Sequence, residues 1–287
     1  MPRLPRTVPP AGSGLSGDGG GGDSGPRGGD RTARPRRLES GSFFDHPQYL
    51  RTVRAERTDA ASTEEALAAA RLVRCKPGAL ILDAGCGDGR HAVPLARAGY
   101  RVVAFDRSSL LLAAGRRSAG GARWPRFVRG SYASLPCRTG RFAAVLSLGT
   151  ALGYLGDDGD LRALCEFRRV LVPGGRLVIE TLHREQLEGR LAAHEERSLP
   201  GGATLRLDRR FDVGRGILRE AQRLRDDAGW GPVRAYEMRL YGVRELGSML
   251  GQAGFGQTEW YGSLAGGGKP TPTTALVVVA QAPRRPA

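Results

Sequence analysis

The chain of 287 residues is 40% hydrophobic and carries a formal net charge of +15. A hydrophobic share of this size supports a sizeable core, which excludes a wholly disordered protein. The positive charge raises the question of an anionic partner such as nucleic acid. However, 42 of the 44 basic residues (44 less Lys76 and Lys269) are Arg. GC-rich coding produces such a skew by itself, so the charge favours an ordinary solvated surface.

Several classes of protein are excluded by what the sequence lacks. The four cysteines form no CxxC pair and no Cys/His cluster with zinc-ligand spacing, so no metal site is expected. So few cysteines in a chain of this length argue against a disulfide framework and favour a reducing, cytoplasmic location. The longest apolar run, residues 275–280, is far shorter than the ~20 residues of a membrane helix. No membrane association is expected.

Residues 1–42 differ in composition from the rest of the chain. They contain 11 of the 43 glycines, 6 of the 18 prolines and no aromatic residue. Such a segment cannot bury enough apolar surface to offset its ordering entropy, so we predict that it is disordered. Its seven Arg and four acidic residues give a charge of only +3 (7 − 4), which leaves a basic arm and a start-site error as alternatives. Residues 283–287 are predicted to be a disordered C-terminus.

From residue 43 onward, helical and strand-like patterns alternate. The segment 62–65, Ser-Thr-Glu-Glu, predicts a capping box that opens an Ala-rich helix ending near Arg74. Short apolar runs separated by helical stretches follow, and they suit strands covered on both faces. This alternation predicts a doubly wound α/β fold. The runs are residues 80–82, 102–105, 143–146, 177–179 and 276–279.

Residues 199–241 interrupt this alternation. Residues 204–212 and 217–225 alternate in polarity around a Gly-Arg-Gly turn, which predicts an antiparallel hairpin, and residues 233–241 predict a third strand. We therefore expect an inserted antiparallel sheet after the fifth strand of the main sheet.

The clearest site signal is the segment Leu-Asp-Ala-Gly-Cys-Gly-Asp-Gly-Arg at residues 82–90. It follows the first expected strand, and its glycines allow a ligand to lie directly on the backbone. The spacing is GxGxG, whereas a dinucleotide loop has GxGxxG. Asp83 and Asp88 would repel a pyrophosphate but suit a cationic cofactor without phosphate. Asp106 lies 21 residues after Gly85, the distance typical of a carboxylate that holds a ribose diol.

These residues resemble the class I S-adenosylmethionine-dependent methyltransferases. Residues 81–108 look like that family's cofactor motif, residues 170–177 like its turn into the fifth strand, and residues 241–255 like its last helix. The resemblance covers residues 43–282 and is closest to the bacterial small-molecule branch, which carries an antiparallel insertion. It implies a Rossmann-like, mostly parallel seven-stranded sheet and S-adenosylmethionine as the cofactor.

The resemblance also implies which residues bind the cofactor. Those at its methionine end would be Asp83, Gly85, Cys86 and Gly87. Asp106 would bind the ribose, with Arg107 beside the adenine. Ser131, next to Tyr132, stands where many family members have the Asp that binds the adenine amino group. Leu148 would lie beneath the methyl group, and Phe43, Phe44, Tyr49 and residues 56–58 resemble the family's N-terminal lid.

Methyl transfer from a sulfonium is an in-line displacement, so it depends on positioning and needs a base only when the nucleophile starts protonated. His183 and Tyr154, which follow the fifth and fourth strands, are the candidate catalytic or substrate-contacting residues. The sequence therefore predicts an enzyme that methylates an O, N or C atom of a small molecule. The alternatives are an RNA or protein methyltransferase that uses an Arg-rich surface, and a cofactor-binding module without catalysis. The oligomeric state is left open, with a dimer among the alternatives.

Overall fold

The computed structural model describes residues 43–187 and 190–284, so the predicted disordered tail at residues 1–42 lies outside the described residues. A seven-stranded sheet, sheet A, has the strand order β11-β12-β5-β4-β1-β2-β3. β12 pairs antiparallel with β5 and β11, and the other neighbours are parallel. The predicted doubly wound, mostly parallel sheet is thus confirmed. Its strands are β1 (Leu80–Ala84), β2 (Arg101–Asp106), β3 (Arg126–Arg129), β4 (Phe142–Ser147), β5 (Leu171–Thr181), β11 (Thr258–Tyr261) and β12 (Leu276–Gln281).

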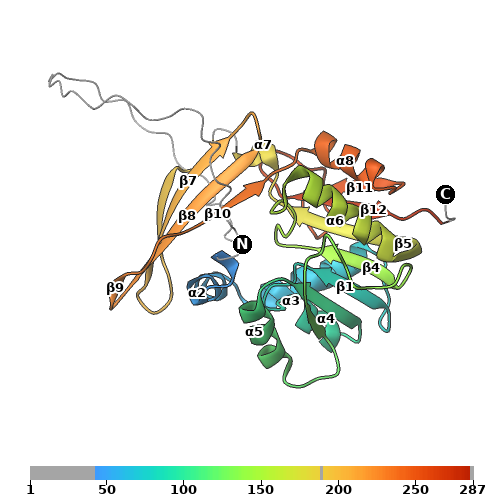
Figure 1. The fold of residues 1–287 in the computed structure, drawn as a ribbon, viewed down its shortest axis with the longest axis horizontal. Coiled ribbons are helices and arrows are strands. Elements are labelled where there is room, and N and C mark those ends of the chain that lie inside the picture. The colour runs from blue at the N-terminus through green and yellow to red at the C-terminus, as the bar shows by residue number, and fades with distance from the viewer. Residues whose placement is uncertain (1–42, 188–189, 285–287) are drawn as a thin grey trace. The chain divides into compact units, whose positions relative to one another are not determined.

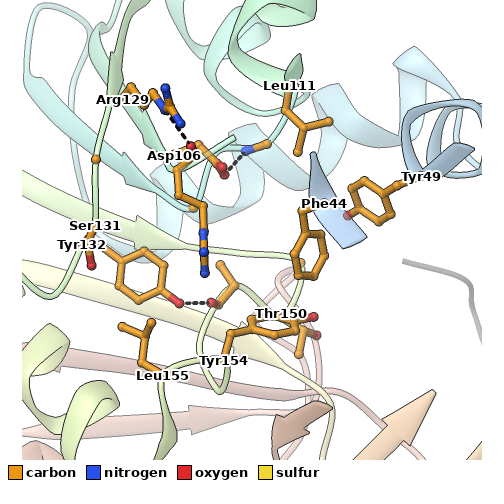
Figure 2. Close-up of a pocket in the computed structure, with 16 residues that line it drawn as sticks. Phe44, Tyr49, Asp106, Leu111, Arg129, Ser131, Tyr132, Thr150, Tyr154 and Leu155 are labelled. Carbon is orange, nitrogen blue, oxygen red and sulfur yellow. Dashed lines mark hydrogen bonds between the residues drawn. The ribbon is translucent and has the colours of Figure 1, made fainter. Parts of the chain in front are cut away.

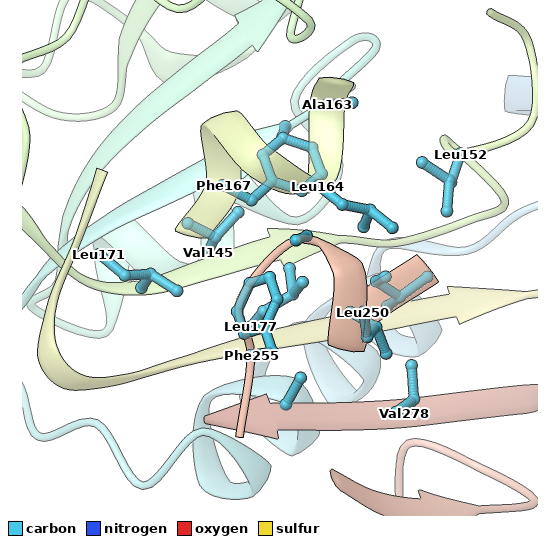
Figure 3. Close-up of a cluster of buried hydrophobic side chains, with 14 of the residues drawn as sticks. Val145, Leu152, Ala163, Leu164, Phe167, Leu171, Leu177, Leu250, Phe255 and Val278 are labelled. Carbon is cyan, nitrogen blue, oxygen red and sulfur yellow. The ribbon is translucent and has the colours of Figure 1, made fainter. Parts of the chain in front are cut away.

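Helices cover both faces of sheet A (Figure 1). One face packs against α6 (Gly156–Val170) and α8 (Val243–Gln252), where Phe167 and Leu177 are fully buried (Figure 3). The other face packs against α3 (Asp59–Leu72), α4 (Ala92–Arg97) and α5 (Ser109–Ala119). Because neighbouring residues of one strand point to opposite faces, two covered faces require strands that are apolar throughout. No helix in the described part of the chain is long and apolar enough to cross a membrane.

Helix α3 begins earlier than predicted. The Thr58 side chain accepts a hydrogen bond from the Ala61 N–H at 3.2 Å and caps the helix at Asp59. The expected capping box at residues 62–65 is therefore wrong, and Ser62 lies buried within the helix. Thr58 is an equally good cap one turn upstream, and the Asp-Ala-Ala segment after it favours helix, so the longer helix forms.

The predicted insertion is a second antiparallel sheet, sheet B, of strand order β10-β8-β7-β6 with β9 paired to β8. Sheet B begins at His194, five residues before the predicted range. The prediction missed β6 because this strand contains no apolar residue and therefore has no hydrophobic pattern. The inner face of sheet B packs on Ala55 of α2 (Pro47–Ala55). The strands are β6 (His194–Ser198), β7 (Thr204–Asp212), β8 (Ile217–Asp226), β9 (Gly229–Trp230) and β10 (Arg234–Arg239), and a short helix, α7 (Arg184–Leu187), precedes them.

Charged side chains are buried on the inner face of sheet B. Arg209 donates to Glu220 and to Glu195, each at 2.5 Å. Arg197 donates to Glu195 at 2.5 Å and to Glu56 at 2.9 Å. These ion pairs link sheet B to the end of α2, so the N-terminal helix and the insertion form one packed unit.

We predict that Arg209→Ala destabilises the protein strongly. The substitution leaves Glu220, whose side chain is 5% exposed, without its cation, and breaking a buried pair costs about 3–5 kcal/mol. Arg206→Ala on the solvent face of the same strand is the control, because its ion pair with Asp208 is half exposed and is worth about 1 kcal/mol or less. Urea unfolding measures both free energies, and equal losses would contradict the structural role of the buried pair.

Candidate cofactor and acceptor site

A cavity of about 510 Å³ opens at the carboxyl ends of β1, β2, β3 and β4 (Figure 2). Ligands of open α/β sheets bind at this edge, because the loops that follow the strands converge there. The size suits a small-molecule ligand. The cavity is lined by Phe44, Tyr49, Gly85, Gly87, Asp106, Arg107, Leu111, Arg129, Gly130, Ser131, Tyr132, Gly149, Thr150, Ala151, Tyr154 and Leu155.

The glycine loop after β1 forms one wall of this cavity. Gly85 has φ of +80°, and a Cβ there would lie 2.5 Å from the Cβ of Ala151 in the β4–α6 loop. Only glycine permits both this conformation and this approach. Asp106 Oδ2 accepts a hydrogen bond from the Gly87 N–H and Asp106 Oδ1 one from the Ser108 N–H, both at 2.9 Å. The carboxylate therefore fixes the loop while it faces the cavity.

Two polar atoms beside the glycine loop are buried without a partner among the described residues: Asp83 Oδ2 and Arg57 Nε. Burial raises the pKa of Asp83 to about 7. Burial, followed by the nearby Arg90, lowers the pKa of Arg57 to about 10. A carboxylate oxygen and a guanidinium N–H that both lack partners match an ammonium and a carboxylate, the two charges of an amino acid. These residues therefore fit the methionine end of S-adenosylmethionine.

The opposite wall of the cavity is aromatic. The ring centroids of Phe44 and Tyr49 lie 4.9 Å apart, and those of Phe44 and Tyr154 lie 5.0 Å apart. Phe43 and Tyr236 pack behind them, 4.8 Å from each other. Burial raises the pKa of the Tyr49 and Tyr154 phenols well above the usual value, so both stay neutral.

The N-terminal segment that carries Phe44 and Tyr49 is fastened across the cofactor loops. The Ser108 hydroxyl donates to Asp45 at 2.7 Å, and Arg54 donates to Asp88 at 3.1 Å. The segment expected to resemble a lid therefore contributes directly to the cavity wall.

The structure brings most of the predicted site residues together. Those that line the cavity are Gly85, Gly87, Asp106, Arg107, Ser131, Tyr132 and Tyr154. Asp83, Cys86 and Leu148 are buried and lie outside the lining. The Tyr132 hydroxyl donates to the Ala151 carbonyl at 2.7 Å and so joins two of the lining segments.

His183 does not line the cavity. Its Nδ1 lies 3.0 Å from the carbonyl oxygen of Thr271 and its Nε2 lies 2.7 Å from Glu185. Both ring nitrogens are engaged and the residue is 5% exposed, so this geometry favours a structural role. The assignment of His183 as a base stays a prediction that the geometry does not support.

Sequence reasoning missed Arg129 and Glu180. Arg129 ends β3, a four-residue strand with two exposed arginines and no continuous apolar run. Glu180 accepts the Gly149 N–H at 2.6 Å beside the cavity. A lone acid directly after the apolar run 177–179 of the fifth strand was a usable signal, because ligands bind at that end of the strand.

We predict that Asp106→Ala weakens S-adenosylmethionine binding by at least about 1 kcal/mol, the scale of a hydrogen bond to a charged group. The loss would combine the predicted contact with the ribose and the anchoring of the Gly87 N–H, which the structure shows. Calorimetric titration measures it, with Asp158→Ala in the exposed first turn of α6 as the control. Unchanged affinity in the Asp106 variant would remove the ribose assignment.

We predict a pH dependence of cofactor affinity that originates in Asp83. Below its pKa of about 7 the carboxyl is neutral, so affinity for an ammonium rises as the pH increases through that value. It falls again above about 8, where an α-amino group loses its own proton. Asp83→Asn should abolish the rise and leave the fall. A wild-type affinity that is flat between pH 5 and about 8 would contradict the assignment.

Comparisons with known proteins match the part of the chain that carries this site. A family model described as a methyltransferase domain matches residues 81–175, from β1 into β5. The chain is 36% identical over 113 residues to a demethylmenaquinone methyltransferase of Clavibacter sepedonicus, covering 39% of this chain and 45% of that protein. It is 32% identical over 111 residues to the human protein named probable tRNA methyltransferase 9B, covering 39% and 23%. The match thus spans less than half of either relative.

Solved structures share the fold over most of the chain. The CcbJ methyltransferase of Streptomyces caelestis has a TM-score of 0.72 at 24% identity, covering 86% of this chain and 100% of that one. CalS10 of Micromonospora echinaspora, an amino pentose methyltransferase with S-adenosylmethionine bound, has a TM-score of 0.63 at 21% identity, covering 82% and 97%. KedS8, a sugar N-methyltransferase of a Streptoalloteichus species, has a TM-score of 0.61 at 19% identity, covering 91% and 100%. The family model thus identifies residues 81–175 as similar to a methyltransferase domain, and these solved methyltransferases have the same fold as this chain.

Proposed function

We propose that the protein transfers the methyl group of S-adenosylmethionine to an amine nitrogen of a small molecule. We choose nitrogen as the acceptor atom because of the few groups lining the cavity that could accept a proton. Among the described lining residues these are three tyrosine phenols and the carboxylate of Asp106. Asp106 is held by two backbone N–H groups at the cofactor loop, and the phenols stay protonated.

An acceptor in this cavity must therefore attack without first losing a proton to the protein. A hydroxyl or carbon acceptor needs a base to remove its proton as the bond to the methyl group forms. A neutral amine attacks without one and releases its proton afterwards to water. The bound cofactor supplies a methyl group on an activated sulfonium leaving group. The names of two similar structures, an amino pentose methyltransferase and a sugar N-methyltransferase, support a nitrogen acceptor.

The protein's own contribution is orientation and the exclusion of water. Asp83 and Arg57 hold the two charges at the methionine end, and Asp106 holds the ribose. The aromatic wall of Phe44, Tyr49 and Tyr154 covers the side of the cavity away from the glycine loop. Positioning of this kind supplies much of the rate of a displacement whose leaving group is already activated.

A second candidate function is RNA methylation, favoured by the solvent face of sheet B. Arg206 pairs opposite Arg223, and Arg210 opposite Arg219, so like charges face each other across two strands. Trp230 lies beneath the guanidinium groups of Arg223 and Arg225 at 5.6 and 5.5 Å. RNA affinity that falls steeply with salt would favour this function, and no detectable binding at physiological salt would remove it.

We predict that the pH dependence of kcat/KM follows the pKa of the acceptor amine. Two small amines with pKa values about two units apart should give rate profiles displaced by the same interval, because the neutral amine is the nucleophile. Methyl transfer from labelled cofactor measures the rate, and matched alcohols are the negative controls. Profiles with one common midpoint would indicate a base on the protein, and transfer to the alcohols alone would overturn the nitrogen assignment. Cofactor binding without transfer to any acceptor would indicate a module without catalysis.

We predict that Tyr154→Phe retains most of the activity. A general base contributes about 10²–10⁴-fold, and Tyr154 is placed here as part of the aromatic wall. A loss of kcat below about tenfold is therefore expected, and His183→Gln should also stay within that range. A loss of kcat of about 10³-fold in either variant would instead identify the substituted residue as a general base.

A further inference from the structure

Thr150 adopts a backbone conformation that β-branched residues rarely occupy. Its φ is +59°, and among the described non-glycine residues only Arg74 shares a positive φ. Arg74 follows helix α3 at its exposed end, where a left-handed residue is common. Thr150 is 2% exposed and lines the cavity. Strained residues persist where the surrounding structure fixes them, and they cluster at functional sites.

Glu180 holds Thr150 in this conformation from β5. Its carboxylate Oε2 accepts the Gly149 N–H at 2.6 Å, and its backbone carbonyl accepts the Thr150 N–H at 3.0 Å. Gly149 is itself left-handed, with φ of +64°. One residue thus binds two successive N–H groups of the β4–α6 loop and fixes both of its unusual dihedrals.

The same loop touches the cofactor motif on its other side. The Cβ of Ala151 abuts Gly85, and a Cβ at Gly149 would lie 2.9 Å from Arg90 Nη2. The charges that face Glu180 are those of Arg90, Arg57 and Glu65, and burial raises the pKa of the Glu180 carboxyl. The loop is therefore packed between the glycine loop and a partly buried charged cluster. A change in the backbone conformation of the β4–α6 loop would therefore also move the cavity wall.

We propose that Glu180 is a positioning residue that keeps Thr150 in its strained conformation between the cofactor loop and the aromatic wall, and so sets the alignment of donor and acceptor. This role rests on the proposed function. An in-line displacement loses rate steeply when the reacting atoms are misplaced by even about 1 Å. The backbone strain at Thr150 is then retained because the conformation serves the alignment, and releasing the loop from that conformation should slow the transfer.

Thr150→Gly tests the strain directly. Glycine adopts a positive φ without strain, so the variant should melt at a higher temperature than the wild type. Its kcat should stay within about threefold of the wild type, because glycine keeps the backbone conformation that the hydrogen bonds from Glu180 impose. Arg74→Gly is the matched control: it relieves the same backbone conformation far from the cavity, so it should raise the melting temperature and leave kcat unchanged.

Glu180 is tested by a pair of variants. Glu180→Gln keeps an oxygen that accepts the Gly149 N–H, so it should retain kcat within about threefold. Glu180→Leu removes the acceptor and should lower kcat at least about tenfold, with little change in cofactor KM. Glu259→Gln, an acid at the opposite end of sheet A near Arg176, is the control and should behave as the wild type. A merely structural Glu180 would lower the melting temperature in the Leu variant without this split between kcat and KM.

The outcomes separate this role from the function on which it rests. Turnover in Glu180→Leu that equals the wild type overturns the positioning role and leaves the proposed function intact. A wild-type protein that binds the cofactor in calorimetry but transfers no methyl group to any acceptor overturns the proposed function, and the positioning role with it. If Glu180→Leu does not fold, the Thr150→Gly and Arg74→Gly pair decides the question: a tenfold loss of kcat in Thr150→Gly alone would assign the effect to the Thr150 side chain and overturn the role of the conformation that Glu180 holds.

Discussion

The cavity depends on the close contact between the glycine loop after β1 and the loop after β4. Gly85 and Ala151 approach so closely that no side chain larger than hydrogen fits at residue 85. Each loop is then fixed by a carboxylate from a neighbouring strand: Asp106 of β2 binds the Gly87 N–H, and Glu180 of β5 binds the Gly149 N–H. Parallel strands bring these four segments to one edge of the sheet, and side chains that are far apart in the sequence become one wall.

The N-terminal segment completes the cavity from the other side, and the insertion packs behind it. Tyr236 of sheet B packs on Phe43 and Phe44, and the ion pairs of Arg197 connect the same sheet to the end of α2. Because charged residues are costly to bury, the ion pairs on the inner face of sheet B specify one arrangement of α2 against the sheet more than they stabilise it. The aromatic wall is thus assembled from three separate segments held by polar contacts behind it.

The fold could be predicted from the sequence because the central strands of sheet A are apolar on both faces. The glycine loop and Asp106 could also be predicted, from their spacing. The elements that the sequence did not reveal share a physical cause. β3 and β6 lie at sheet edges and consist largely of charged residues, so neither has a hydrophobic period. Both are held by strand pairing, and β6 also by ion pairs. The true start of α3 was missed because two capping signals compete within one turn.

Within the site, the sequence by itself determined the cofactor half: a strand, a glycine loop and an acid at a fixed distance are local features, and local spacing encodes them. Which residues surround the proposed methyl acceptor could be seen only in the tertiary structure. It turned His183 toward Thr271 and Glu185, away from the cavity, and it brought Phe44, Tyr154 and Tyr236 together from distant segments. It also set the left-handed backbone of Thr150, because that conformation is imposed by bonds from β5 and is not encoded in the residue's own preference.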